Sequence, residues 1–146
     1  GEVAGVLVMD DYAHHPTAIR ETLAALKARY PERRLWSIYE PKSNTARRNY
    51  HQEAYAHAFG SAERVVLAKP FTKDDGLGRD QLLDVETLVQ DISEAGTDAV
   101  YRENVPAILD YLKAETRSGD LVVIMANSGF GGLTESLLLA LGERGV

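Results

Sequence analysis

The stretch that decides the fold is Val3-Ala4-Gly5-Val6-Leu7-Val8-Met9, followed by Asp10-Asp11-Tyr12-Ala13-His14-His15-Pro16. Its first half is apolar and rich in valine, which predicts a buried strand. Its second half holds two carboxylates, a phenol and two imidazoles, and Pro16 suits the first turn of a helix. Ligands of open α/β sheets bind at the carboxyl edge of the strands. These polar residues between a strand and a helix therefore indicate a site at that edge.

The alternation of strands and helices continues to the end of the chain. Ile19, Leu23 and Leu26 recur at helical spacing, which predicts a helix from Pro16 to about Arg29. Further strands are expected at 34–39, 64–68, 98–101 and 121–125, and further helices at 49–59, 85–95, 105–116 and 133–141. In the helix 49–59 we expect Tyr50, Ala54 and Ala58 to face inward, and Asn104 is expected to cap the helix 105–116.

Strands separated by helices imply βαβ units and a mainly parallel sheet. We therefore predict a single domain over residues 1–146 with an α/β fold, a three-layer Rossmann-like sandwich. Its mainly parallel sheet has five or six strands with helices on both faces. The place for a sixth strand is near Gly76–Leu83.

Composition excludes several classes of function. The 146 residues carry a formal net charge of -6, which argues against a nucleic-acid-binding surface of clustered Lys and Arg. No apolar run approaches the roughly 20 residues of a membrane helix, and no signal peptide is visible. The absence of cysteine excludes disulfides and thiolate metal sites, and it fits a cytoplasmic protein. Because the chain starts Gly-Glu-Val, we expect it to be a fragment of a longer protein.

The loop after the first strand offers acid and base groups on different sides. Asp10 and Asp11 are adjacent in a strand, so their side chains should point to opposite faces. His14 and His15 are adjacent too, and their rings should diverge, which makes them poor chelators and a zinc site unexpected. The other interpretation is that one histidine caps the following helix and the other packs.

Two later loops should lie at the same edge of the sheet. Glu40–Arg48 gathers three cations among small polar residues, which suits an anionic ligand, although a solvated basic turn has the same composition. Ala126–Gly132 is rich in glycine and could hold an anion or peptide with its backbone amides. It is not a phosphate loop, because no Gly-Lys-Ser/Thr ends it.

These motifs together resemble the C-terminal domain of the Mur ligases, ATP-dependent enzymes that join amino acids or peptides to UDP-muramyl precursors of peptidoglycan. Asp-Asp-Tyr-Ala-His-His-Pro looks like the start of that domain. The segments Glu40-Pro41-Lys42-Ser43-Asn44-Thr45 and Met125-Ala126-Asn127-Ser128-Gly129-Phe130-Gly131-Gly132 look most like the murein peptide ligase branch. That branch attaches L-alanyl-γ-D-glutamyl-meso-diaminopimelate to UDP-N-acetylmuramic acid. The alternative is the L-alanine-adding branch, which shares Asp-Tyr-x-His-His-Pro but has a second loop more like Gln-Pro-His-Arg-Tyr.

The resemblance implies roles for the first loop. Asp11 would lie by the ribose of ATP, and Tyr12 near the adenine or the sugar. His14 would lie near the triphosphate and the incoming amine, so it is the catalytic candidate.

The resemblance also implies a pocket for the acceptor peptide. Lys42, Asn44 and Arg48 would hold its carboxylates, and Asn127, Ser128 and Phe130 would line the same pocket. A diaminopimelate-adding relative has Asn-Pro-Arg after its third strand, where this chain has Lys69-Pro70-Phe71.

The rest of the reaction belongs to other parts of such an enzyme. The phosphate loop and the Mg²⁺ ligands lie on the central domain of the family, so no metal ligand is assigned here. The implied small molecules are ATP, Mg²⁺, UDP-N-acetylmuramic acid and the murein tripeptide. The implied protein partners are the central and N-terminal domains of the same chain, without nucleic acid or membrane.

Two rival classes are weaker. A receiver domain also has an acidic pair after its first strand, but it needs an aspartate after the third strand and a lysine after the fifth. Here those strands are followed by Lys69-Pro70 and Ala126-Asn127. A non-catalytic nucleotide- or peptide-binding module stays open as an alternative.

Overall fold

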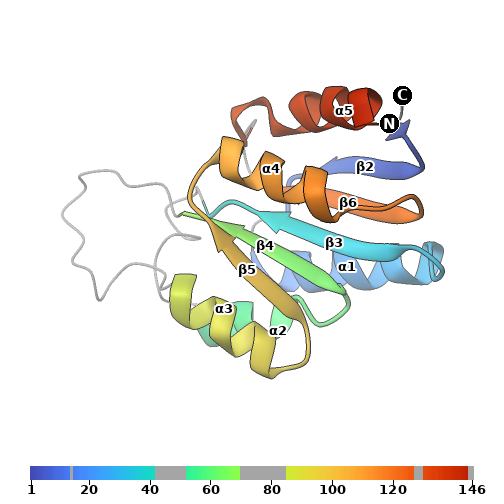
Figure 1. The fold of residues 1–146 in the computed structure, drawn as a ribbon. Helices are drawn as coiled ribbons and strands as arrows, with labels where there is room; N and C mark the ends of the chain where they lie inside the picture. Colours follow the sequence, from blue (N-terminus) through green and yellow to red (C-terminus); the bar gives the residue numbers. More distant parts are fainter. Residues whose placement is uncertain (14, 42–51, 70–84, 127–129, 145–146) are drawn as a thin grey trace.

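The computed structural model describes residues 1–13, 15–41, 52–69, 85–126 and 130–144 (Figure 1). The predicted α/β class is confirmed, because strands alternate with helices and join one six-stranded sheet. The strands are β1 (Glu2–Val3), β2 (Val6–Asp11), β3 (Arg34–Tyr39), β4 (Arg64–Ala68), β5 (Asp98–Arg102) and β6 (Asp120–Met125). The helices are α1 (Pro16–Arg29), α2 (Gln52–Ala58), α3 (Val85–Glu94), α4 (Val105–Glu115), the 3₁₀ turn η3 (Phe130–Gly132) and α5 (Leu133–Arg144).

The sheet has the strand order β1-β2-β6-β3-β4-β5. Each neighbouring pair is parallel except β1 with β2, which is antiparallel. The chain therefore passes from β2 over the place of β6 to β3, continues outward to β5, and returns to fill the gap between β2 and β3. This reversal places the last strand at the centre of the sheet.

The first strand differs from the prediction. Val3 pairs with Val6 across Ala4 and Gly5, whose φ angles are 54° and 80°. Two successive positive φ angles form the tight two-residue turn that joins antiparallel strands. The predicted strand that starts at Val3 is therefore divided by a hairpin, and β1 is the sixth strand. The place proposed for it, residues 76–83, lies outside the described residues.

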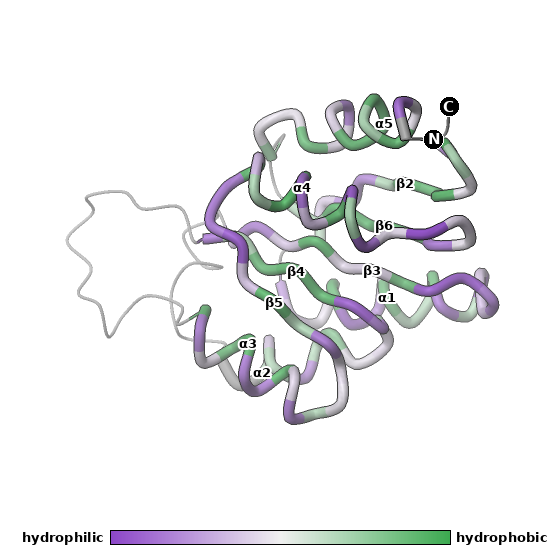
Figure 2. Tube along the Cα trace, viewed as in Figure 1, coloured by the Kyte–Doolittle hydropathy of each residue, from purple (hydrophilic) through white to green (hydrophobic). Residues whose placement is uncertain are grey.

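Helices cover both faces of the sheet and enclose two hydrophobic cores (Figure 1). Ile19, Leu23 and Leu88 belong to the core between the sheet and α1, α2 and α3. Ile108 and Leu137 belong to the core between the sheet and α4 and α5. All six residues of β6 are buried, as expected for a strand covered on both faces. Hydropathy follows the same layers, with apolar strands inside and polar positions along the helices (Figure 2).

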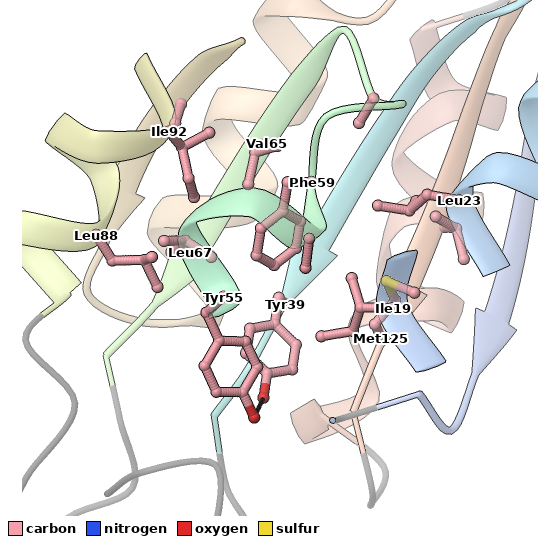
Figure 3. Close-up of a cluster of buried hydrophobic side chains, with 14 of the residues drawn as sticks. Ile19, Leu23, Tyr39, Tyr55, Phe59, Val65, Leu67, Leu88, Ile92 and Met125 are labelled. Carbon is pink, nitrogen blue, oxygen red and sulfur yellow. Dashed lines mark hydrogen bonds between the residues drawn. The ribbon is translucent and has the colours of Figure 1, made fainter. Parts of the chain in front are cut away.

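The inward face of α2 is rotated from the expected one. Ala54 is exposed, whereas Tyr55 and Phe59 are fully buried under β3 and β4 (Figure 3). Ala58 is buried as predicted, and Tyr50 lies outside the described residues. Aromatic side chains gain more by burial than alanine does, so the two rings set the helix phase.

The amino edge of the sheet is closed by a buried carboxylate. Asp120 is 3% exposed and accepts hydrogen bonds from Arg34 Nε at 3.0 Å and Nη2 at 2.8 Å. Trp36 Nε1 and the Arg117 backbone N–H donate to its Oδ2 at 2.9 and 2.8 Å. The hydrogen bond to Asp120 raises the pKa of Arg34. These contacts bind the strand starts together, and the opposite edge carries the polar loops.

Candidate functional site

The carboxyl ends of the parallel strands stop in register. Asp11 of β2 is paired with Met125 of β6, which is paired with Tyr39 of β3. Tyr39 is paired in turn with Leu67 of β4, and Leu67 with Tyr101 of β5. The segments that follow these strands therefore begin at one edge of the sheet, as predicted.

The chain leads to different faces of the sheet after β2, β6 and β3. The helices after β2 and β3, α1 and α2, pack on one face of the sheet. The helix after β6, α5, packs on the other face. Because β6 lies between β2 and β3, the chain after β6 leads to one face of the sheet, and the chain after each of its two neighbours leads to the opposite face. This is the topological switch point at which open α/β sheets bind their ligands.

Backbone hydrogen bonds fix the start of all three loops. The Ala126 N–H donates to Asp11 O, and the Glu40 N–H donates to Met125 O, each at 3.2 Å. The pairing of the strands thus continues one residue beyond their ends. Pro41 is buried directly after Glu40. The polar segments therefore leave from a rigid base.

Asp10 and Asp11 point to opposite faces, as predicted. The Asp10 carboxylate is on the α5 side, where it accepts a hydrogen bond from Thr134 Oγ1. The half-buried Asp11 accepts the Ala13 N–H at 2.7 Å through Oδ1. This bond from a residue two positions later shapes the loop between β2 and α1. Asp11 is therefore the carboxylate on the side of that loop.

The residues that follow Asp11 alternate between solvent and core. Tyr12 is 80% exposed, whereas Ala13 is buried. His15 is the N-cap residue of α1 and is exposed, but its side chain makes no capping hydrogen bond. The interpretation of His15 as a capping side chain is therefore not supported. Pro16 starts α1 in its first turn, as predicted.

Phe130 is the only described residue among those assigned to the acceptor pocket. Its side chain is 2% exposed and belongs to the core under α4 and α5. That burial favours packing as the role of its ring. The other expected residues, His14, Lys42, Asn44, Arg48, Asn127 and Ser128, lie outside the described residues.

A buried pair of phenols at the end of β3 was not foreseen. Tyr39 Oη donates to Tyr55 Oη at 3.2 Å, and both residues are fully buried (Figure 3). Burial raises the pKa of Tyr39 far above its ordinary value, and the neighbouring Tyr55 adds to the shift. Burial raises the pKa of Tyr55 as well. Aromatic residues in a strand and a nearby helix were the sequence signal, but their contact depends on the phase of α2.

Opposite charges meet at the ends of β4 and β5. Lys69 Nζ lies 3.9 Å from Glu103 Oε1, in an exposed ion pair of the kind that contributes little to stability. Burial raises the pKa of Tyr101, and the charges of Glu103 and Glu86 raise it further.

The described residues form neither a metal-binding cluster nor a membrane-spanning helix. In the described parts of the chain, no three His, Cys, Asp or Glu side chains come together in a way that could hold a metal ion. Among the described helices, none has the length and apolar character to cross a membrane.

Known proteins identify the family. Residues 1–128 match the family model described as "Mur ligase, glutamate ligase domain". The chain belongs to the Mur ligase family. The match spans the switch point, and the chain has the Rossmann-like α/β fold of the C-terminal domain of these ligases.

Two kinds of Mur ligase are similar to the chain. The UDP-N-acetylmuramate–L-alanyl-γ-D-glutamyl-meso-2,6-diaminoheptandioate ligase of Escherichia coli (strain K12) is 33% identical over 99% of this chain and 29% of the relative. The UDP-N-acetylmuramate–L-alanine ligase of Desulfitobacterium hafniense is 31% identical over 94% of this chain and 30% of the relative. The crystal structure of a murein peptide ligase from Psychrobacter arcticus superposes with a TM-score of 0.80 at 34% identity, over 97% of this chain and 28% of that one. The chain thus spans less than a third of the length of these Mur ligases.

Proposed function

We propose that the chain is the C-terminal domain of an ATP-dependent ligase of the cytoplasm that serves peptidoglycan recycling. This ligase joins L-alanyl-γ-D-glutamyl-meso-diaminopimelate to UDP-N-acetylmuramic acid. The observation that carries the proposal is the switch point, at which the ends of β2, β6 and β3 are in register and their loops diverge. Each of these loops carries one of the three motifs that resemble the family.

The nucleoside of ATP suits the loop after β2. The exposed ring of Tyr12 offers a flat apolar surface to a base or sugar. The half-buried carboxylate of Asp11 is an acceptor for ribose hydroxyls, and its bond to the Ala13 N–H holds it in place. Both side chains therefore fit a nucleoside at this edge. ATP would supply the phosphoryl group that converts the carboxylate of UDP-N-acetylmuramic acid to an acyl-phosphate; the amine of the peptide then attacks the acyl-phosphate, and phosphate leaves. Mg²⁺ would be held mostly by the central domain.

The other loops suit the anionic peptide. Lys42, Asn44 and Arg48 provide charges and an amide for its carboxylates, and arginine can bind a carboxylate with two parallel hydrogen bonds. Asn127 and Ser128 would line the same pocket. His14, next to the triphosphate, would be close to the incoming amine and is the proposed catalytic residue. Closure against the central domain would exclude water from the acyl-phosphate.

One feature supports the tripeptide-adding reaction over the addition of L-alanine. The motif Glu40-Pro41-Lys42-Ser43-Asn44-Thr45 resembles the tripeptide-adding branch. Overall identity does not separate the two reactions, because the tripeptide ligase of E. coli is 33% identical to the chain and the L-alanine ligase of D. hafniense is 31% identical. The L-alanine-adding reaction is therefore the second candidate.

Ligation with three acceptors in parallel tests the proposal. Full-length protein is supplied with ATP, Mg²⁺ and UDP-N-acetylmuramic acid, together with L-alanine, the dipeptide or the tripeptide. We expect the highest kcat/KM with the tripeptide. A preference for L-alanine would establish the second candidate. No ligation with any acceptor, in a protein without an upstream Gly-Lys-Ser/Thr phosphate loop, would favour a non-catalytic binding module.

An arginine variant tests the acceptor pocket. Arg48→Ala should raise the KM of the tripeptide while leaving the KM of ATP nearly unchanged, because the peptide loses a charge-assisted hydrogen bond. Such a bond is worth ~1.5–3 kcal/mol, or roughly 10- to 150-fold in affinity. Arg20→Ala is the matched control, since it removes the same charge from an exposed position of α1. An unchanged acceptor KM in Arg48→Ala would refute its assigned role.

A further inference from the structure

Asp10 has no part in the proposed binding of ATP, yet it connects two sides of the site. Its carboxylate lies at the end of β2, one residue before Asp11, and accepts the hydrogen bond of Thr134 Oγ1. Thr134 is the second residue of α5, the helix that follows the glycine-rich loop. One hydrogen bond therefore ties the strand that leads into the first loop to the helix that leads out of the third.

The segment between Ala126 and Thr134 is held at several points. At its start, the Ala126 N–H donates to the carbonyl of Asp11. Before α5, the buried ring of Phe130 packs in the core. A Cβ on Gly131 would lie 3.1 Å from Val105 Cγ2, so the backbone there packs closely against the start of α4. The Asp10–Thr134 bond is the attachment at the far end.

The turn before α5 has an unusual backbone. Phe130, Gly131 and Gly132 have φ angles of 50°, 58° and 74°. The left-handed region is unfavourable for a residue with a side chain, so Phe130 keeps this conformation only if its surroundings enforce it. Contacts on both sides of the turn are therefore needed to define where the loop ends.

We propose that the Asp10–Thr134 hydrogen bond is a positioning contact. It fixes the position of the start of α5, and with it the end of the loop after β6, relative to the end of β2. It deepens the proposed function and rests on it, because the two loops are the walls that would hold acceptor peptide and ATP. Small displacements of a substrate-holding group lower the rate strongly. Asp10 is exposed and Thr134 half-buried, so loss of the bond should shift the loop without unfolding the domain.

Kinetics of the full-length ligase provide the first test. Thr134→Val keeps the shape of the side chain but removes its hydroxyl, and we expect the KM of the tripeptide to rise about 10-fold, because the residues that would hold the peptide are displaced. Thr134→Ser restores the hydroxyl and should restore the KM. Thr22→Val, in the middle of α1, is the matched control and should behave as wild type. A tripeptide KM within twofold of wild type in Thr134→Val would overturn the proposal.

A double-mutant cycle tests whether Asp10 and Thr134 act through the same hydrogen bond. Asp10→Ala should raise the tripeptide KM by a similar factor, and Asp10→Ala combined with Thr134→Val should add little more, because either change removes the same bond. Effects that multiply in the double variant would show that the two residues act independently, and that would overturn the proposal too.

Hydrogen exchange gives a readout that does not depend on activity. In the 146-residue chain, Thr134→Val should speed the exchange of amides 130–136, whereas amides of β6 and α1 should be unchanged. If wild-type full-length protein does not ligate, the proposed function is wrong, but the exchange result still decides whether the bond positions the loop. Unchanged exchange at 130–136 would overturn the positioning role by itself.

Discussion

At the end of β2, two neighbouring carboxylates have different environments because the pleat of the strand turns them to opposite faces. Asp10 meets the hydroxyl of Thr134 on the α5 side, and Asp11 meets the backbone of Ala13 at the loop to α1. Two adjacent aspartates thus make different contacts. Exchanging the two roles would require a shift of the strand by one residue, which would turn Val6 and Val8 from the core on the α5 side to the opposite face of the sheet.

Variants of Asp11 separate its charge from its role in the loop. In the full-length ligase, Asp11→Ala should raise the KM of ATP by roughly 10-fold or more, because a charge-assisted hydrogen bond is worth ~1.5–3 kcal/mol. Asp11→Asn keeps an oxygen for the Ala13 N–H and should therefore preserve the stability of the domain while still weakening ATP. Steady-state kinetics and thermal unfolding measure the two effects. An ATP KM that is unchanged in Asp11→Ala would remove this residue from the nucleotide site.

Tyr39 and Tyr55 should make stability depend on pH in the alkaline range. Their pKa values are raised in the folded chain, mainly by burial, so the unfolded chain loses the phenol protons first. The stabilisation is complete below the ordinary tyrosine pKa of about 10 and decreases as the pH rises above it. The free energy of unfolding should fall by up to about 1.4 kcal/mol per pH unit for each phenol. Urea unfolding between pH 8 and 11 measures this.

Phenylalanine variants assign that pH dependence. Tyr39→Phe and Tyr55→Phe each remove one titrating group and should flatten the fall in stability above pH 10. Tyr12→Phe is the control, because Tyr12 is 80% exposed. If Tyr39→Phe retains the full alkaline slope, the slope has another source.

Among the elements, the β1–β2 hairpin is closed by a turn that tolerates few side chains. A Cβ on Gly5 would lie 2.1 Å from Ser118 Oγ, and the φ of 80° is itself unfavourable for other residues. Gly5→Ala should therefore destabilise the chain by more than the ~1 kcal/mol of the backbone conformation alone. Ala4→Gly is the matched variant and should be neutral or stabilising, since φ at Ala4 is 54°. Chemical unfolding of both variants checks this, and equal stability of Gly5→Ala and wild type would contradict it.

Helix starts that depend on interactions between neighbouring residues were predicted correctly from the sequence. Pro16 starts α1, and Asn104 caps α4 by accepting the Ala107 N–H at 2.9 Å, both as predicted. The alternation of strands and helices predicted the layered sheet, and the carboxyl edge followed from it.

Features that depend on distant contacts could not be predicted in this way. The phase of α2 is set by the fit of Tyr55 and Phe59 under the sheet rather than by spacing alone. The hairpin at Ala4 was missed because alanine is uncommon where φ is positive. The Asp10–Thr134 bond joins residues 124 positions apart, which no local pattern reports. For the candidate site, the sequence motifs predicted the carboxyl edge of the sheet. The hydrogen-bond partners of Asp10 and Asp11 could be identified only from the structure.

At the scale of the whole molecule, the two edges of the sheet differ in character. At the amino edge, Asp120 and Arg34 bind the strand starts together, and Arg64 of β4 forms an ion pair with Asp98 of β5 at 3.0 Å. At the carboxyl edge, the strands end in register and their loops diverge. One edge therefore provides rigidity, and the other is the edge at which open α/β sheets bind their ligands.

The 146-residue chain should fold by itself but should not ligate. The described residues form a hydrophobic core on each face of the sheet, so we expect cooperative thermal unfolding by circular dichroism. The sequence contains no Gly-x-x-x-x-Gly-Lys-Ser/Thr phosphate loop, and the described residues contain no cluster that could hold a metal ion. With ATP, Mg²⁺, UDP-N-acetylmuramic acid and the tripeptide, ADP release should therefore equal that of a protein-free blank. Full-length protein in the same buffer is the control. Ligated product formed by the folded 146-residue chain would show that this domain carries the whole reaction, against the division of the active site between domains.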